Sequence, residues 1–574
     1  MTLMVLDRVA AMAAEDPGRP AVRARDGSLS FAELAERADA VACALVKYGI
    51  GPERRVAVSG GRSRWFVPSL LAVWLVGAVA VPLDDRHPLD RRGHVVRDSG
   101  AVLVLGNSDL DTTLPVLTAE ECAAGEIPVV TSHPDQCAYT IYTSGTTGRP
   151  KGVEVTYRGL NTFLGALAGL HLPSGGAGIN AVSPAFDGWL WCTLLYLMHG
   201  QTVAVVDVAD DAAALLGEQI AAVAPRTVSL TPSLYSVCEA AARAAEVLVV
   251  AGELCPPSLA ERLADGRRVL NVYGPTETTI AATWADTARG DDPRTIGRAL
   301  DGYLSYVLDP SWNPAETGEL FIGGPGVARG YAGLSGLTAA RFVPDPFGEP
   351  GARMYRTGDL VRRRPDGLLD YLGRTDSQVK VHGTRIELAE VEAVATRLPG
   401  IGAAVCVLIS PDTLGLAVVR DHMAGTADCG KGAGDIADQV RAHCRLALPL
   451  AAVPARVIVV DEMPATTTGK ADRGRIAAML AEEPVDRGAR TPSTRHEREV
   501  QTLWSELLGV PVVDVEGDFF EIGGHSLLAA TMVAALRRRT GLPVSMRHLL
   551  TQPTVAGLAE QLDQMAAHGR GDAP

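Results

Sequence analysis

Short, almost wholly apolar segments recur through the first half of the chain and constrain its fold more than any other feature. They read RVAV at 55–58, AVLVL at 101–105, TVAVV at 202–206 and VLVVA at 247–251. Segments of this length without polar alternation are typical of strands buried on both faces of a parallel sheet. Helical patterns separate them, so the sequence predicts an α/β fold.

One of these helical patterns has a clear beginning and end. Ser30 and Glu33 have the spacing of a capping box, which predicts that a helix begins there. Gly49 ends the pattern. The apolar residues that share one face of this predicted helix are Leu34, Ala38, Val41 and Leu45.

The chain has 574 residues, which is too many for one hydrophobic core. After Asp370 the sequence pattern changes and predicts strands, a turn and a helix. Residues 482–495 are polar and show no periodicity, which is typical of a linker. We predict a large α/β core domain at 1–375, a small α+β subdomain at 376–481, a linker at 482–495, a helical bundle at 496–568 and a tail at 569–574.

The predicted bundle depends on amphipathic spacing near the C-terminus. A first helix has apolar residues at i, i+3, i+4, i+7 and i+8, namely Val500, Leu503, Trp504, Leu507 and Leu508. Leu528, Met532 and Leu536 mark a second helix, and Pro553 opens a region suited to a third.

The segment from Trp65 to Leu83 is apolar over most of its length, but Pro68, Ser69 and Gly77 interrupt it. We expect a buried helix followed by a strand rather than a membrane span. The N-terminus lacks the basic start and long apolar run of a secretion signal.

The net charge and the spacing of the cysteines argue against several classes of function. The formal net charge of −14 argues against a nucleic-acid partner. The nine cysteines include no Cys-x-x-Cys pair, so neither a disulfide framework nor a zinc site is suggested. We expect a soluble, cytoplasmic protein without a membrane partner.

The segment YTSGTTGRPKG, from Tyr142 to Gly152, is rich in glycine and hydroxyl groups. Backbone N–H groups and hydroxyls in such a turn form an anion site, and Lys151 adds positive charge. A Walker-type loop requires Ser or Thr after Gly-Lys, whereas Gly152 follows Lys151 here. The segment therefore indicates a phosphate site of another kind, with a solvated surface turn as the alternative.

Further blocks follow this loop in order. They are NVYGPTETT, GELFIGGPGVARGY, YRTGDLVR, GRTDSQVKVHGTRIELAEVE, TTTGKADR and DFFEIGGHSLL. Together with the loop they resemble the adenylate-forming enzymes, specifically a nonribosomal peptide synthetase (NRPS) adenylation domain joined to a peptidyl carrier domain. The resemblance covers nearly the whole chain and implies an adenylate-forming core, a small C-terminal subdomain and a helical-bundle carrier domain.

The resemblance implies an ATP site and a magnesium ion. Glu277 matches the family's magnesium-binding glutamate, which also makes it a catalytic candidate, and Asp359 matches the aspartate that accepts both ribose hydroxyls. The full set expected to bind ATP is Thr143, Ser144, Gly145, Thr146, Thr147, Gly148, Lys151, Asn271, Tyr273, Gly274, Thr276, Asp359 and Arg374.

Lys470 matches the catalytic lysine that holds the substrate carboxylate and the α-phosphate. Preorganised positive charge of this kind is usually the largest catalytic contribution. Because the substrate carboxylate is already an anion, the first step needs no general base. Asp376 matches the hinge about which the small subdomain rotates before the second step. Rotation there would remove Lys470 from the cleft and bring in the KVHGTR face near Gly383.

Ser526 lies after two glycines and before an apolar helical run, a position that favours phosphate at a helix N-terminus. A helix cap is the plain alternative. The resemblance implies that a phosphopantetheinyl transferase attaches 4′-phosphopantetheine to Ser526, on which the activated acid is loaded as a thioester. The linker at 482–495 would keep the carrier at a high effective concentration.

Asp187 matches the family's aspartate that pairs with the substrate α-ammonium, which favours an α-amino acid. The substrate pocket maps onto Asp187, Gly188, Trp191, Ser229, Val249, Ala251, Val272, Ile280, Ala281 and Lys470. None of the residues expected to face the substrate side chain is charged, so we expect a bulky, neutral, aromatic amino acid. Tryptophan and phenylalanine come first, and tyrosine or a large aliphatic residue follows. Ser229 is a candidate acceptor for the N–H of a substrate indole.

Two other functions stay open: an aryl- or acyl-acid ligase with a carrier, and a non-catalytic carrier scaffold. The order of the domains predicts a freestanding unit that presents its amino acid in trans to a tailoring or condensing enzyme in secondary-metabolite biosynthesis. Units of this kind often work with a small MbtH-like helper protein, which is a further candidate partner.

Overall fold

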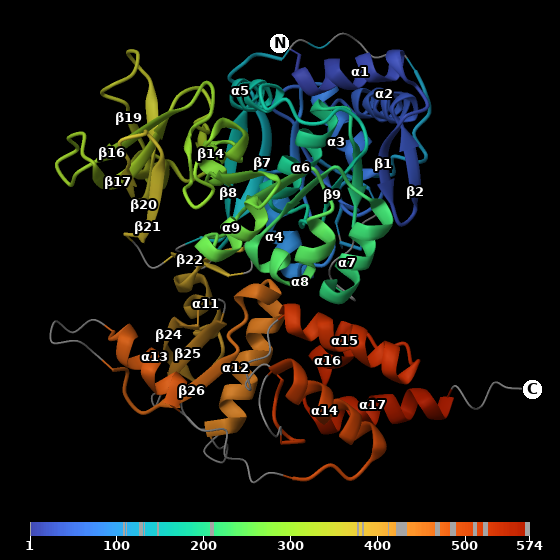
Figure 1. The fold of residues 1–574 in the computed structure, drawn as a ribbon, viewed down its shortest axis with the longest axis vertical. Coiled ribbons are helices and arrows are strands. Elements are labelled where there is room, and N and C mark those ends of the chain that lie inside the picture. The colour runs from blue at the N-terminus through green and yellow to red at the C-terminus, as the bar shows by residue number, and fades with distance from the viewer. Residues whose placement is uncertain are drawn as a thin grey trace, which may run out of the picture. The chain divides into compact units, whose positions relative to one another are not determined.

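The computed structural model describes the following residues: 2–106, 109–110, 112–125, 130, 132–145, 149–206, 212–375, 378–381, 384–410, 413–420, 433–464, 471–482, 490–508, 514–519 and 526–568. The chain divides into two units (Figure 1). Unit 1 comprises Met1–Ser144, Pro150–Val206 and Ile220–Gln378, and unit 2 comprises Gly145–Arg149, Asp207–Gln219 and Val379–Pro574.

The larger sheet of unit 1 has nine strands. Their order is β15 (Arg298–Ala299), β14 (Thr283–Asp286), β13 (Arg268–Tyr273), β12 (Val247–Ala251), β11 (Thr227–Leu230), β9 (Ala177–Asn180), β10 (Thr202–Val205), β1 (Pro20–Ala24) and β2 (Gly27–Ser30). The strands from β13 through β1 in this order pair in parallel. Antiparallel strands flank them at both edges.

A second sheet of unit 1 has seven strands. Their order is β18 (Gly330–Tyr331), β8 (Lys151–Thr156), β7 (Cys137–Thr143), β4 (Val79–Pro82), β3 (Arg55–Val58), β5 (Leu103–Leu105) and β6 (Val116–Leu117). The four apolar segments that predict buried strands form β3, β5, β10 and β12, so this prediction is confirmed.

A third sheet completes unit 1 and is antiparallel throughout. It contains β16 (Leu304–Leu308), β17 (Thr317–Gly323), β20 (Arg353–Arg363) and β19 (Phe342–Pro344) in that order, and β21 (Leu369–Arg374) pairs with β20.

Helices alternate with these strands along the chain, and most of them contact a strand of the sheets (Figure 1). They are α1 (Met4–Glu15), α2 (Phe31–Lys47), α3 (Phe66–Leu75), α4 (Leu89–Ser99), α5 (Tyr157–Ala168), α6 (Asp187–Met198), α7 (Ala212–Val223), α8 (Pro232–Ala242), α9 (Pro257–Ala264) and α10 (Ser335–Arg341), with the 3-10 helices η1 (Thr276–Thr278) and η2 (Thr287–Arg289). The capping box at Ser30 is present, with hydrogen bonds of 2.8 and 3.2 Å to Glu33. The predicted helix and strand within 65–83 are α3 and β4.

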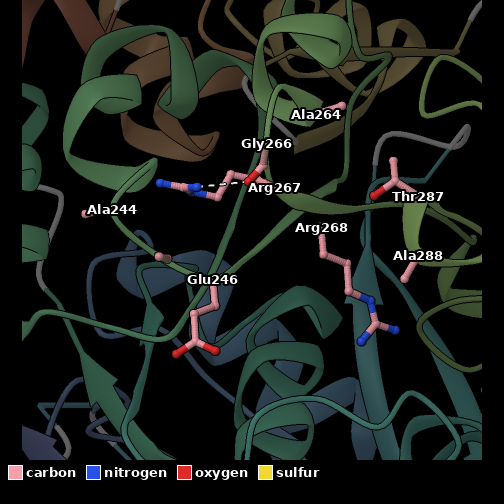
Figure 2. A pocket seen from close by; sticks show the side chains of 9 residues that line it. Ala244, Glu246, Ala264, Gly266, Arg267, Arg268, Thr287 and Ala288 are labelled. Atoms are coloured by element: carbon pink, nitrogen blue, oxygen red, sulfur yellow. Dashed lines mark hydrogen bonds between the residues drawn. The ribbon is translucent and has the colours of Figure 1, made fainter.

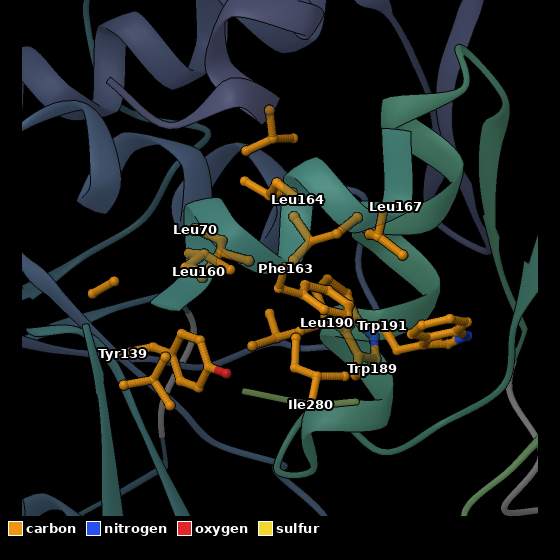
Figure 3. Close-up of a cluster of buried hydrophobic side chains, with 14 of the residues drawn as sticks. Leu70, Tyr139, Leu160, Phe163, Leu164, Leu167, Trp189, Leu190, Trp191 and Ile280 are labelled. Atoms are coloured by element: carbon orange, nitrogen blue, oxygen red, sulfur yellow. The ribbon is translucent and has the colours of Figure 1, made fainter. Parts of the chain in front are cut away.

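The core of unit 1 surrounds α6. All residues from Trp189 to Met198 are buried, and a helix that is apolar all round must lie inside the protein. Figure 3 shows Trp189, Leu190 and Trp191 of α6 close to Phe163 of α5 in this core. The first residues of α6 are thereby held firmly, which matters because Asp187 begins the helix.

Unit 2 contains a small α+β part. Its strands are β22 (Gln378–Val381) paired with β23 (Thr384–Glu387), and β24 (Ile401–Ser410), β25 (Thr413–Arg420) and β26 (Arg456–Val460) in one sheet. Its helices are α11 (Leu388–Ala395), α12 (Ala433–Ala447), η3 (Leu450–Ala452) and α13 (Arg473–Glu482).

The C-terminal part of unit 2 is a helical bundle. It contains α14 (Arg495–Leu508), α15 (Ser526–Thr540), α16 (Met546–Thr551) and α17 (Val555–His568). Trp504 is fully buried, and its ring meets Phe519 edge to face at 4.9 Å between centroids. The three predicted helices are confirmed, and the short α16 adds to them. No helix in the described part of the chain is long and apolar enough to cross a membrane.

Candidate active site

The expected substrate pocket collects residues from the carboxyl ends of neighbouring parallel strands. Ser229 of β11 lies opposite Val249 of β12, and Ala251 of β12 lies opposite Val272 of β13. In open α/β sheets, ligands bind at this end of the strands. The register of the sheet thus brings together four residues that are far apart in the sequence.

Asp187 begins α6 beside Tyr139, a buried residue of β7. Burial raises the pKa of Tyr139 well above its usual value, and the negative charge of Asp187 raises it further. Gly188 follows, and a Cβ at this position would lie 3.3 Å from Cγ1 of Val182. The helix therefore starts where little space is left around the backbone.

Trp191 lies one turn further along α6 and is hydrogen-bonded to Ser229. Its Nε1 donates to Oγ of Ser229 at 3.0 Å, and both residues are only 3% exposed. The sequence suggested that Ser229 would accept an N–H from a substrate indole, but the protein's own indole already donates to it. This bond uses one of the two acceptor lone pairs of the hydroxyl and so weakens the argument for tryptophan, while the identity of the substrate stays a prediction.

The pocket positions after β13 lie on a strained backbone. Thr279 and Ile280 have φ angles of 56° and 75°, in the left-handed region that β-branched residues rarely occupy. Oγ1 of Thr279 donates to the carbonyl of Gly326 at 2.6 Å, which holds the turn in place. Such strain costs about 1–3 kcal/mol per residue and is found mainly at functional sites. Ala281 follows the turn and is fully buried.

Glu277 lies in η1 and is completely buried. The hydroxyl of Tyr331 donates to its Oε1 at 2.7 Å, and Nζ of Lys151 lies 3.7 Å from the same oxygen. Lys151 is itself buried and is positioned over the ring of Tyr331 at 4.5 Å. A buried carboxylate and a buried ammonium therefore lie side by side at the end of the glycine-rich segment.

Asp359 of β20 is the centre of a second polar cluster. Arg374 of β21 donates to its Oδ1 at 2.7 Å, and the hydroxyls of Tyr273 and Tyr371 also donate to this carboxylate. Burial raises the pKa of Tyr273, and the charge of Asp359 raises it further. The cluster joins residues expected to contact adenine and ribose.

Several further residues that are expected to bind ATP are among those the structure describes. Oγ1 of Thr143 is buried without a hydrogen-bond partner in the part of the chain that the structure describes. A buried hydroxyl at the start of a glycine-rich turn fits a phosphate ligand. The amide of Asn271 donates to the carbonyl of Pro293 at 2.9 Å. The other described residues of this set are Ser144, Gly145, Gly274 and Thr276, and all but Gly274 are buried.

Several expected site residues lie outside the described residues: Thr146, Thr147, Gly148, Asp376, Gly383 and Lys470. Their roles stay predictions.

The described residues contain no group of three or more His, Cys, Asp or Glu side chains that could hold a metal ion. Magnesium in nucleotide sites keeps several water ligands and is bound by one or two carboxylates together with phosphate oxygens. A single buried carboxylate such as Glu277 therefore fits a magnesium ion that arrives with a nucleotide.

Two tyrosines of the site were not assigned a role from the sequence. Tyr331 is in the block GELFIGGPGVARGY, and Tyr371 lies just before Arg374. Tyr331 donates a hydrogen bond to Glu277, which is 54 residues away in the sequence. Tyr371 donates one to Asp359, which is 12 residues away. Only their occurrence in or beside the family's blocks could have drawn attention to them.

A shallow hollow of about 760 Å³ lies elsewhere on unit 1, near the amino ends of β12 and β13 (Figure 2). Its charged side chains are engaged within the protein: Glu246 with Arg226 at 2.6 Å and Arg268 with Asp286 at 2.6 Å. Since ligands of α/β sheets bind at the opposite, carboxyl end, this hollow is not the candidate site.

In the carrier, α15 begins at Ser526, as the sequence predicts. The end of the predicted linker is attached to this bundle. Thr494 and Glu497 form a reciprocal capping box with hydrogen bonds of 3.0 and 3.1 Å. Arg490 also bonds to Glu497 and Glu516, at 2.6 and 2.9 Å. Residues 490–494 are therefore fastened to the carrier and do not act as free linker.

Family models match three segments of the chain. The AMP-binding enzyme model matches residues 9–332, and the AMP-binding enzyme C-terminal domain model matches residues 390–470. The chain belongs to the AMP-binding enzyme family. A phosphopantetheine attachment site model matches residues 498–562, so an ATP-using adenylate-forming domain is followed by a carrier domain.

Known proteins similar to this chain indicate that it is of the NRPS type within this family. One relative is CymA of Salinispora arenicola, described as a "probable non-canonical nonribosomal peptide synthetase". It is 39% identical over 96% of this AMP-binding enzyme, and the match spans 7% of the length of CymA. Novobiocin biosynthesis protein H of Streptomyces niveus is 36% identical over 95% of the chain, which covers 93% of that protein.

A solved structure supports the same assignment. Holo-PA1221, described as an NRPS protein containing adenylation and PCP domains bound to a vinylsulfonamide inhibitor, matches with a TM-score of 0.78 at 26% identity. The match covers 98% of this chain and 96% of the other. The predicted fold class and the resemblance to an NRPS adenylation domain with a carrier are confirmed.

Proposed function

We propose that this AMP-binding enzyme activates a neutral α-amino acid as its aminoacyl-AMP and loads it on its own carrier at Ser526. The observation that supports an amino acid is Asp187, a carboxylate at the start of α6 in a pocket that is otherwise mainly apolar. An ammonium group would bring a positive charge beside this carboxylate, whereas an aryl or fatty acid offers no group of opposite charge.

The chemistry of the first step is displacement. The substrate carboxylate attacks the α-phosphorus of ATP and pyrophosphate leaves, so the protein has to position the two anions and neutralise their charge. Lys151 and Lys470 would supply positive charge, and Asp359 would accept the ribose hydroxyls. A bound magnesium ion neutralises phosphate charge, and Glu277 is the residue that would hold it.

Two classes of substrate side chain are candidates for the pocket. The small residues Gly188, Ala251 and Ala281 favour the bulky aromatic acids expected from the sequence, and phenylalanine now precedes tryptophan because Ser229 is engaged. The second candidate is a small neutral side chain, which is favoured by the volume that the buried ring of Trp191 takes at a pocket position. Apolar pockets separate single methylenes by only ~1–3 kcal/mol, so both classes belong in the test.

The partners follow from the carrier. A phosphopantetheinyl transferase has to modify Ser526, and we propose that the loaded amino acid is used in trans by a tailoring or condensing enzyme. An MbtH-like helper protein is part of the proposal and is tested by adding one to the assay.

A panel of amino acids and their deamino analogues in ATP–pyrophosphate exchange tests the proposal, together with intact-mass measurement of the loaded carrier. We expect exchange with neutral amino acids alone. Lys470→Ala should lower exchange by ~10²–10³-fold. Ser526→Ala should keep exchange and lose loading.

Two other results would change the assignment. Exchange with deamino acids only would assign an aryl- or acyl-acid ligase, and no exchange with any acid would indicate a carrier scaffold. Asp376→Pro tests the hinge: adenylate formation should persist while carrier loading slows, and equal losses in both steps would argue against rotation at this residue.

A further inference from the structure

Tyr331 contacts both charged residues of the expected phosphate and metal site. Its hydroxyl donates to Oε1 of Glu277 at 2.7 Å, and its ring centroid lies 4.5 Å from Nζ of Lys151. All three residues are at least 94% buried. One neutral side chain therefore meets a buried carboxylate with its polar end and a buried ammonium with its aromatic face.

The position of Tyr331 is fixed by the protein itself. Its strand, β18, pairs with β8, so that Tyr331 lies opposite Val153, two residues from Lys151. The backbone N–H of Tyr331 donates to Oγ1 of Thr338 at 3.0 Å, and its ring meets that of Phe342 edge to face at 5.3 Å. The hydroxyl is thus aimed at Glu277 by a strand pairing and a ring contact.

Glu277 requires such a partner. Nζ of Lys151 lies 3.7 Å from Oε1, which is within ion-pair distance but longer than a hydrogen bond. A buried charge is costly unless it is both paired and hydrogen-bonded. The Tyr331 hydroxyl supplies the short bond, and the negative face of its ring attracts the ammonium.

We propose that Tyr331 is a positioning residue for adenylation, which rests on the proposed function of this site. It holds Glu277 by its hydroxyl and Lys151 by its ring, and so keeps the two charges in a long ion pair of 3.7 Å. The carboxylate thereby stays in place for a metal–nucleotide complex and is not drawn into a tight ion pair with the lysine.

Tyr331→Phe tests this in the full chain because it removes the hydroxyl and keeps the ring. Binding of Mn²⁺ with a non-hydrolysable ATP analogue is measured by electron paramagnetic resonance, and the Mg²⁺ dependence of pyrophosphate exchange is measured in parallel. We expect roughly tenfold weaker metal binding and a similar rise in the Mg²⁺ concentration at half-maximal rate, the effect of losing one hydrogen bond to a charged group. The KM for the amino acid should not change.

Tyr306→Phe is the matched control, because it also removes a tyrosine hydroxyl that donates to a carboxylate, Asp345, at 3.1 Å. It should leave metal binding unchanged. In a Glu277→Gln background, Tyr331→Phe should have no further effect on metal binding, since the two residues act together.

Wild-type metal affinity in Tyr331→Phe, or an equal loss in Tyr306→Phe, overturns the proposal, as does an additive effect in the double variant. The metal-binding measurement needs no amino acid. It therefore decides the role of Tyr331 even if the exchange panel rejects the proposed function.

Discussion

Arg374 and Asp359 lie directly opposite each other on β21 and β20, and Nη1 of the arginine is 2.7 Å from Oδ1 of the aspartate. The carboxylate is only 5% exposed and also accepts from two tyrosine hydroxyls. The carboxylate that we expect to bind the ribose is therefore held in place by the protein's own hydrogen bonds.

Asp359→Asn should raise the KM for ATP by ~10–100-fold, because hydrogen bonds to a charged acceptor contribute about 1.5–3 kcal/mol. The variant should also lose any preference for ATP over 2′-deoxy-ATP in pyrophosphate exchange. Asp370→Asn is the control, since Asp370 pairs with Arg364 at 2.6 Å on the neighbouring strand. A retained preference for the ribose hydroxyl in Asp359→Asn would contradict the assignment.

Trp191→Phe should change both stability and selectivity. Loss of the indole N–H leaves Oγ of Ser229 buried without this partner, which costs about 1–3 kcal/mol in the free energy of unfolding. The space gained should lower the KM for larger amino acids in the exchange panel.

The control for this variant is Trp189→Phe, because Nε1 of Trp189 has no hydrogen-bond partner among the residues described. It should disturb packing without changing selectivity. A selectivity shift of equal size in both variants would show that Trp191 has no special role in the pocket.

Gly274→Ala should destabilise unit 1, because a Cβ there would lie 2.4 Å from Cα of Ala281. Overpacking against backbone typically costs ~1–3 kcal/mol, and the displaced turn should also raise the KM for ATP. Thermal unfolding and exchange kinetics measure the two effects. Gly165→Ala in α5 meets no atom within 4 Å and should instead stabilise the helix by up to about 1 kcal/mol.

Glu497 should make the stability of the carrier depend on pH. Burial alone would raise its pKa, but hydrogen bonds from Ser493, Thr494 and Arg490 outweigh this and lower it to about 2. Because the folded pKa lies below the ordinary value of 4.5, the stabilisation is complete above about pH 4.5 and is lost as the pH falls toward 2.

Glu497→Gln should therefore destabilise the carrier at pH 7 and flatten its stability between pH 5 and pH 2. Hydrogen exchange of the carrier helices within the full chain measures this effect. Glu499→Gln breaks a pair with Arg495 on the outside of the same helix and should change little. An unchanged pH profile in Glu497→Gln would exclude this carboxylate as the cause.

Local pattern was sufficient to predict much of the fold. The strands at 55–58 and 247–251, the capped helix after Ser30 and the helix that contains Trp504 are all encoded in short stretches of sequence. The order of strands in the sheets was not predicted, because pairing joins segments as distant as β1 and β10. The hydrophobic periodicity of a short segment does not indicate which distant strand will pair with it.

The residues of the site were predicted from their positions in sequence motifs, whereas their neighbours in space were not predicted. Asp187 and Glu277 were found from the family's blocks, but their neighbours Tyr139 and Tyr331 come from other strands of the fold. The hydrogen bond between Trp191 and Ser229 was not predicted for the same reason, since the two residues are 38 positions apart in the sequence. The capping box of Thr494 and Glu497 was missed although its spacing is visible in the sequence.

That capping box alters how far the carrier can travel. An extended chain spans at most ~3.3–3.6 Å per residue. Because the five residues at 490–494 are bound to the carrier, the maximum length of the linker expected at 482–495 is shorter by about 17 Å. Lengthening the chain before residue 490 would extend this reach and leave the carrier intact. The same insertion after residue 490 would fray the first turn of α14.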